Sequence, residues 1–185
     1  MTIRTQIDYA AAWASSIPFE AFVGTANEQK VELWRSYRSR AKIHEDERRR
    51  IEALQAPRRV LVLVADWCGD AIRSVPTLVA LGEISALVDV RLLSVDEHPD
   101  VLTAHTTRGA RAIPIAIVLD EGNAPLGVWG PRPAPLQARL RAKIASEGSP
   151  NADDKGEFYM PIMDWYAKDK GRTVAQEILM ELERD

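Results

Sequence analysis

The stretch Val60-Leu61-Val62-Leu63-Val64-Ala65-Asp66-Trp67-Cys68-Gly69-Asp70-Ala71 decides the fold of this chain. Its first five residues are apolar and rich in valine, which is typical of a strand covered on both faces of a sheet. Apolar residues at helical spacing then predict a helix from about residue 69 to 81. Cys68 therefore stands where a buried strand passes into the first turn of a helix.

C-terminal to this stretch, strands and helices are predicted to alternate. N-terminal to it, the chain is predicted to be helical. Strands are predicted over residues 90–95, 115–119 and 126–129, with helices between and after them. Before residue 57 we predict helices, one of them starting with a capping box from Thr25 to Glu28 and carrying Trp34 on its apolar stripe. The polar stretch 146–157 predicts a loop, followed by further helices, the last with a capping box from Thr173 to Gln176.

We therefore expect a single domain over residues 1–185. It would consist of an N-terminal helical extension (1–57), an α/β core (58–146), and a loop with C-terminal helices (147–185). Apolar residues make up 46% of the chain and charged residues 28%, an ordinary globular composition.

Charge and composition exclude several classes of partner. A formal net charge of -3 argues against a general binder of nucleic acid or anionic membranes. The longest apolar run, from Val60 to Ala65, cannot cross a bilayer, and the first eight residues lack a secretory signal. The expected location is therefore the cytoplasm. The three histidines show no ligand spacing with Cys68, so we expect no metal site, and no cofactor is implied.

Cys68 is the single cysteine, so a partner sulfur for it must come from another molecule. A thiol at a helix start is favoured as thiolate by unpaired N–H groups and by the helix dipole. Nearby Asp66 and Asp70 oppose this, so we expect an exposed thiol of moderate reactivity. A lone cysteine is, however, more often a small buried hydrophobic residue.

A second feature is Ile113-Pro114, immediately before the predicted strand 115–119. Proline inside a central strand would cost a backbone hydrogen bond, whereas at a strand entry it is tolerated and can be cis. A cis proline leaves the preceding backbone free to pair with an extended peptide.

These residues resemble the thioredoxins. Trp67-Cys68-Gly69-Asp70-Ala71 is similar to their Trp-Cys-Gly-Pro-Cys motif, Pro76 to the proline in the following helix, and Arg111-Ala112-Ile113-Pro114 to their cis-proline loop. The resemblance implies an α/β, thioredoxin-like core, a central mixed sheet flanked by helices, with N-terminal and C-terminal helical extensions. It also implies that Cys68 is the catalytic residue, with Ile113, Pro114 and Arg111 forming a substrate groove.

A bacterial thioredoxin-like subfamily that lacks the second active-site cysteine is more similar still. Its members carry Trp-Cys-Gly-Asp, and this chain also has the subfamily's Gly130-Pro131-Arg132-Pro133 and Trp165-Tyr166-Ala167-Lys168-Asp169 stretches.

Three departures from thioredoxins restrict the chemistry. Ala71 replaces the resolving cysteine, Asp70 replaces the motif proline, and Val62 replaces a buried acid. Without a second thiol the protein cannot release a mixed disulfide internally.

The lesser candidates each have two interpretations. Trp67 either caps the thiol or simply packs against its neighbours. Arg111 either offers a cation to the thiolate or to the carboxylate of a small thiol, or is an exposed loop residue. Arg132 either pins its loop or contacts a ligand.

The first functional hypothesis is a monothiol oxidoreductase in which Cys68 exchanges with a protein disulfide or a low-molecular-weight thiol, and an external thiol resolves the adduct. The second is a redox-inactive module that binds a peptide or partner in the groove at Pro114. A thiol-dependent transferase or peroxidatic activity of Cys68 is a third, weaker alternative.

Overall fold

The computed structural model describes residues 7–151 and 153–185. The expected lack of a secretory signal concerns residues 1–8, of which residues 1–6 lie outside the described residues. Among the helices that are described, none is both long and apolar enough to cross a membrane.

The centre of the molecule is a mixed sheet of four strands in the order β2-β1-β3-β4. The strands are β1 (Arg58–Val64), β2 (Val88–Ser94), β3 (Ile115–Leu119) and β4 (Pro125–Trp129). β1 runs parallel to β2 and antiparallel to β3, and β3 runs antiparallel to β4. Every residue of β3 and the last five residues of β1 are buried, as expected for central strands covered on both faces.

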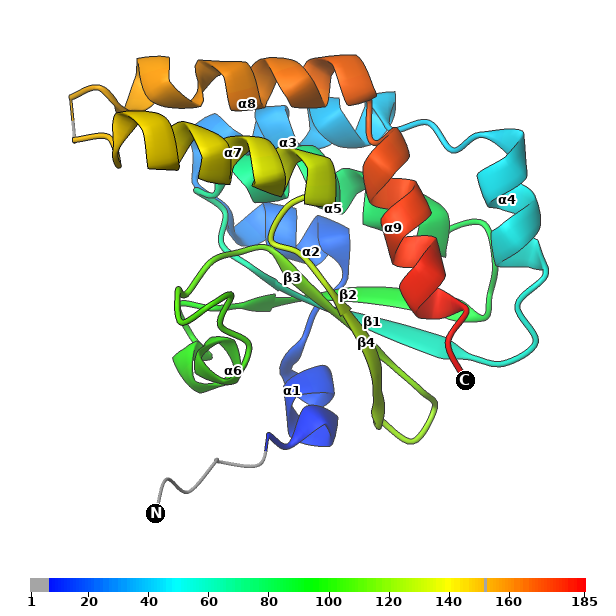
Figure 1. The fold of residues 1–185 in the computed structure, drawn as a ribbon. Coiled ribbons are helices and arrows are strands. Elements are labelled where there is room, and N and C mark those ends of the chain that lie inside the picture. The colour runs from blue at the N-terminus through cyan, green and yellow to red at the C-terminus, as the bar shows by residue number, and fades with distance from the viewer. Residues whose placement is uncertain (1–6, 152) are drawn as a thin grey trace.

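Helices cover both faces of this sheet (Figure 1). In that view α3, α5, α7, α8 and α9 lie above the sheet, and α1 and α6 lie below it. The described helices are α1 (Tyr9–Ser15), α2 (Phe19–Thr25), α3 (Glu28–Arg40), α4 (Glu45–Glu52), α5 (Gly69–Gly82), α6 (Pro99–Ala104), α7 (Ala134–Glu147), α8 (Lys155–Asp169) and α9 (Arg172–Leu182).

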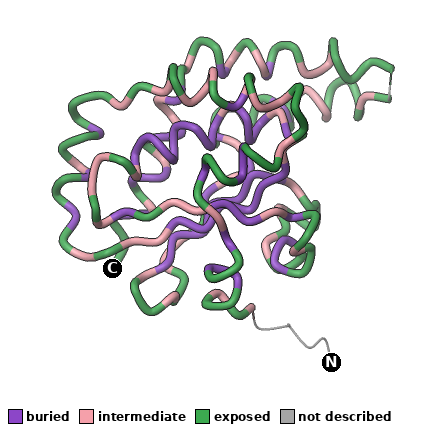
Figure 2. The backbone as a smooth tube through the Cα atoms, turned by 180° about the vertical axis from the view of Figure 1, so that it is seen from behind, coloured by how far each residue is buried: buried purple, intermediate pink, exposed green. Residues whose placement is uncertain are grey.

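The buried apolar side chains form a large cluster and a small one. The large cluster joins the sheet, α5 and α9 to the N-terminal helices α1 and α2 and to Trp34 of α3. The small cluster consists of Leu136, Leu140, Ile162 and Tyr166, between α7 and α8. Figure 2 shows the same division: buried residues run through β1, β3 and α5, whereas most of the α7–α8 pair is intermediate or exposed.

Trp34 ties the N-terminal helices to the loop between β1 and α5, which leads into Cys68. This side chain is fully buried, and the rings of Phe19 and Phe22 meet it edge-on. Its indole Nε1 donates to the carbonyl oxygen of Asp66 at 3.2 Å, and the Asp66 carboxylate accepts from the Asn27 backbone N–H at 2.8 Å. The start of α3 therefore holds the residues that lead into Cys68.

Several element boundaries differ from those predicted. Asn27, not Thr25, caps α3, with its side chain accepting from the Gln29 N–H, while the Thr25 hydroxyl bonds backward to Phe22. Gly171 precedes α9, and the Thr173 hydroxyl and N–H are both held by Asp169 instead of forming a capping box. The loop expected over 146–157 is shorter, because α7 continues to Glu147 and α8 begins at Lys155.

Candidate functional site

Cys68 occupies the N-cap position of α5, directly after the loop that follows β1. The expectation of an exposed thiol is wrong: only 7% of the residue is accessible. The Sγ atom donates to the carbonyl oxygen of Ile113 at 3.4 Å. The loop before Pro114 therefore lies against the thiol, and this contact, together with the neighbouring side chains, buries it.

The Ile113–Pro114 peptide bond is cis, and so is the Gly130–Pro131 bond of the loop after β4. Gly130 packs directly on Pro114. It has a φ of +117°, and a Cβ built there would lie 2.3 Å from the Pro114 carbonyl oxygen. Only glycine permits both this backbone angle and this approach, so the Gly-Pro-Arg-Pro stretch is fixed against the Ile113-Pro114 loop.

We expect Gly130→Ala to lower the free energy of unfolding by about 2 kcal/mol, since the residue would be strained and would collide with backbone. Urea denaturation measures the loss. Gly156→Ala in α8 is the matched control, because a Cβ there meets nothing within 4 Å. That substitution is expected to leave stability unchanged or to raise it by about 0.5 kcal/mol. Equal losses at the two positions would contradict the close approach.

Asp70, two residues after Cys68, lies at the centre of a buried polar network. Its Oδ2 pairs with Nη2 of Arg132 at 2.5 Å, and its Oδ1 accepts from the hydroxyl of Tyr166 at 3.0 Å. The side chains of Asp70 and Arg132 are 9% and 15% exposed, and Tyr166 is 4% exposed. Burial and the adjacent Asp70 carboxylate strongly raise the pKa of Tyr166, so its hydroxyl is a donor throughout the neutral range. The network joins α5, the Gly-Pro-Arg-Pro loop and α8.

Glu177 of α9 holds the same loop from its other side. One carboxylate oxygen accepts from Trp129 Nε1 at 2.7 Å, and the other accepts from the Ala134 N–H at 2.8 Å. The end of β4 and the start of α7 are thereby fixed, which places Arg132 beside Asp70.

The environment of Cys68 favours the neutral thiol. Burial raises its pKa, and the Asp70 carboxylate raises it further, while backbone N–H groups at the start of α5 and the charge of Arg132 lower it. The N–H groups at the helix start and the Asp70 carboxylate have opposite effects on this pKa, as expected. The largest effect, however, is desolvation, which depends on the tertiary packing. At neutral pH the thiol is protonated.

A pocket of about 400 Å³ opens beside the thiol. It is lined by residues of four chain segments: Trp67, Cys68, Gly69, Asp70, Arg111, Ala112, Ile113, Arg132, Tyr159 and Met163. Trp67 is 60% exposed, so it borders the pocket instead of packing in the core. Arg111 is also exposed and donates to the Pro99 carbonyl oxygen at 3.4 Å.

The pocket unites most, but not all, of the predicted site residues. Ala71 and Val62 are completely buried in α5 and β1. Pro114 is also buried and is not among the residues that line the pocket. Sequence reasoning missed Tyr159 and Met163 of α8 and the pairing of Asp70 with Arg132 and Tyr166. The one available signal was that Arg132 and Tyr166 both fall in the stretches shared with the bacterial subfamily, but this does not indicate contact.

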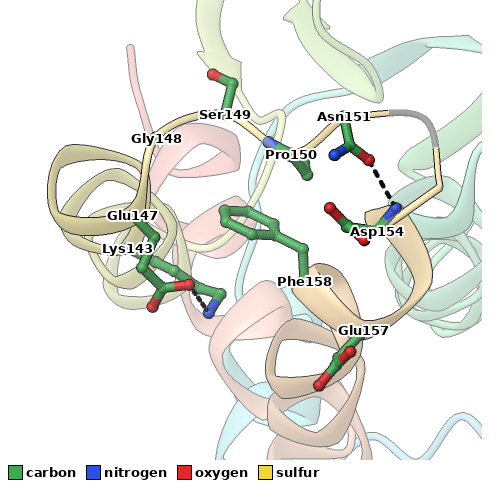
Figure 3. A pocket seen from close by; sticks show the side chains of 9 residues that line it. All are labelled: Lys143, Glu147, Gly148, Ser149, Pro150, Asn151, Asp154, Glu157 and Phe158. Atoms are coloured by element: carbon green, nitrogen blue, oxygen red, sulfur yellow. Dashed lines mark hydrogen bonds and ion pairs between the residues drawn. The ribbon is translucent and has the colours of Figure 1, made fainter.

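A second hollow, of about 420 Å³, lies at the end of the α7–α8 pair (Figure 3). Phe158 points into it, and the lining cation Lys143 is paired with Glu147 at 2.6 Å and lies over the Phe158 ring. Its lining contains the hydroxyl of Ser149 and the amine of Lys143 but not Cys68, which lines the other pocket. Within residues 7–151 and 153–185, no group of three or more His, Cys, Asp or Glu residues is arranged to hold a metal ion.

Comparison with known proteins agrees with this architecture. A crystal structure of a protein of unknown function from Pseudomonas aeruginosa superposes with a TM-score of 0.74 at 19% identity, over 96% of this chain and 98% of that one. An HIV epitope-scaffold superposes with a TM-score of 0.73, also at 19% identity and with the same coverage. At this identity the likeness concerns the fold alone. No match was found among curated proteins. A family model described as thioredoxin matches residues 16–145, from the end of α1 through nearly all of α7. With that match over most of its length, and the mixed sheet and Cys68 junction described above, this chain belongs to the thioredoxin family.

Proposed function

We propose that this protein is a monothiol member of its family, in which Cys68 exchanges with disulfides and an external thiol resolves the adduct. The observation that carries the proposal is that the single cysteine lines a pocket and touches the loop before Pro114. In a reducing compartment such as the cytoplasm, small thiols would serve as the resolving partner.

The step requires no oxidant beyond the disulfide itself. The Cys68 thiolate attacks one sulfur of a disulfide RSSR, forming the Cys68–S–S–R bond and expelling RS⁻, which takes up the proton that Cys68 lost. A second thiol R′SH then attacks the R sulfur of the adduct as its thiolate, forming the disulfide R′SSR and expelling the Cys68 thiolate, which takes up the proton lost by R′SH. Because Ala71 offers no internal thiol, this second attack must come from outside.

The raised pKa of Cys68 sets the rates of both steps. Little thiolate is present at neutral pH, so the adduct forms slowly. A thiol of high pKa is also a poor leaving group, so external thiols displace Cys68 slowly. The proposed role is therefore to hold a mixed disulfide for long periods, not to turn over rapidly.

The proposal is tested by alkylation with iodoacetamide across pH, together with intact-mass detection of the adduct with uncharged 2-hydroxyethyl disulfide. Since burial raises the thiol pKa, half-maximal alkylation of the folded chain is expected at a higher pH than for the same chain in urea, where the pKa of the thiol is about 8.5. One adduct per chain should form and be released by added thiol. Cys68→Ser, which has no thiol, should show none.

The alternative, a redox-inactive module that binds a peptide or partner, is favoured by the burial of Cys68 and by Ala71. If the folded chain gives no adduct even at high pH, while the unfolded chain is labelled completely, disulfide exchange is refuted and the binding module stands.

A further inference from the structure

We propose that the pocket beside Cys68 selects small disulfides and thiols that carry a carboxylate, with Arg111 as the side chain that binds the anion. This inference rests on the proposed function and names its substrate class. Three features of the pocket support it: the charges in its lining, its size, and the helix that forms part of its wall.

The side chains that line the pocket carry a net charge of one positive unit. The charged lining residues are Asp70, Arg111 and Arg132. Asp70 and Arg132 neutralise each other at 2.5 Å. Arg111 is exposed and forms no ion pair with any residue the structure describes, donating only to the Pro99 carbonyl oxygen. An arginine in this state has donors left for a carboxylate.

The positive pocket contrasts with the acidic chain around it. The protein as a whole carries a formal net charge of -3, so its long-range field would attract cations in preference to anions. A preference of Cys68 for anionic reagents would therefore report the local charge of Arg111 and not the charge of the whole molecule.

Helix α8 makes the site suited to a small ligand. Tyr159 and Met163 of this helix line the same pocket as the Arg111-Ala112-Ile113 loop. A ligand beside Ile113 would therefore share with α8 a volume of about 400 Å³, which falls in the range of small-molecule sites. The hydrogen bond from Tyr166 to Asp70 fixes α8 to the residue that follows Gly69 in the motif. An extended protein segment pairing along Ile113 would meet this wall.

The test uses three reagents that share the same two-carbon arm but differ in charge. They are 3,3′-dithiodipropionate (dianion), 2-hydroxyethyl disulfide (neutral) and cystamine (dication). The rate of adduct formation at Cys68 is measured by intact mass and divided by the rate of the urea-unfolded chain, which removes intrinsic differences between reagents. We expect the normalised rate for dithiodipropionate to exceed that for cystamine roughly tenfold, and the difference to shrink as ionic strength rises.

Arg111→Gln should reduce the dianion rate by about threefold to fivefold and leave the neutral rate unchanged. Arg139→Gln is the matched control: it removes the same charge from an exposed position on α7, outside the pocket lining, and should leave the ratio of rates as it was. Insulin serves as the protein disulfide and should form no adduct with the folded chain.

The outcomes separate this inference from the proposed function. If no reagent forms an adduct, disulfide exchange itself is refuted. If the neutral reagent reacts but the three charges give equal normalised rates, or if Arg111→Gln changes nothing, only the selectivity is refuted. If insulin forms an adduct as readily as dithiodipropionate, the site serves protein disulfides, and the small-ligand assignment is overturned.

Discussion

Replacing Asp70 by Asn is expected to make the protein less stable and its cysteine more reactive. The substitution keeps the shape of the side chain but leaves the Arg132 guanidinium, 15% exposed, without its counter-charge. Removing one partner of a buried ion pair costs about 3 kcal/mol of unfolding free energy. The same change removes a negative charge that raises the pKa of the Cys68 thiol, so alkylation should begin at a lower pH than in the unmodified protein.

Two controls isolate the ion pair. Tyr166→Phe keeps the pair and loses one hydrogen bond to the Asp70 carboxylate, at a cost of about 1.5 kcal/mol. Asp164→Asn removes the same charge from an exposed position on α8 and should change stability by less than about 0.5 kcal/mol. Urea unfolding and the pH profile of alkylation are measured for all three variants. An Asp70→Asn variant as stable as Asp164→Asn would contradict the proposed importance of the pair.

Replacing Trp34 by Ala is expected to have the largest effect, a loss of about 4 kcal/mol of unfolding free energy. The side chain is completely buried, in contact with Phe19 and Phe22 of α2 and hydrogen-bonded to the loop that leads into Cys68. The substitution would leave a large cavity and remove the hydrogen bond to Asp66. Since domains are commonly stable by only about 5–15 kcal/mol, the variant should unfold at a much lower urea concentration. Its Cys68 should also be alkylated faster at a given pH, because the residues that lead into it lose their anchor.

A matched deletion at an exposed site provides the control for Trp34. Trp67→Ala removes the same side chain where it is 60% exposed, and less than about 1 kcal/mol should be lost. Trp34→Phe keeps most of the apolar volume and loses the hydrogen bond, so an intermediate loss of about 1 kcal/mol is expected. If Trp34→Ala and Trp67→Ala were equally stable, the proposed anchoring of the N-terminal helices by Trp34 would be incorrect.

The position of the site could be predicted from the sequence because local signals fix it. The apolar run of β1 ends immediately before Cys68, and the helical spacing of α5 begins immediately after it. The core strands and the thioredoxin resemblance follow from the same local patterns. The Asn27 cap of α3 and the start of α9 at Arg172 were missed because capping depends on which polar side chain reaches the first N–H groups. Asp169 took both polar groups of Thr173, and no periodicity encodes that choice.

The sequence by itself determined the family, the mixed α/β core and the presence of one thiol at a helix start without a resolving partner, because these depend on residue type and short-range order. The burial of that thiol was decided by tertiary structure alone. Ile113 and the Asp70–Arg132–Tyr166 network come from segments far apart in the chain, and their packing removes water from Cys68. The effect of desolvation on the pKa of Cys68 then outweighs that of the helix start. The fold therefore keeps this cysteine as a protonated thiol beside a positively charged pocket.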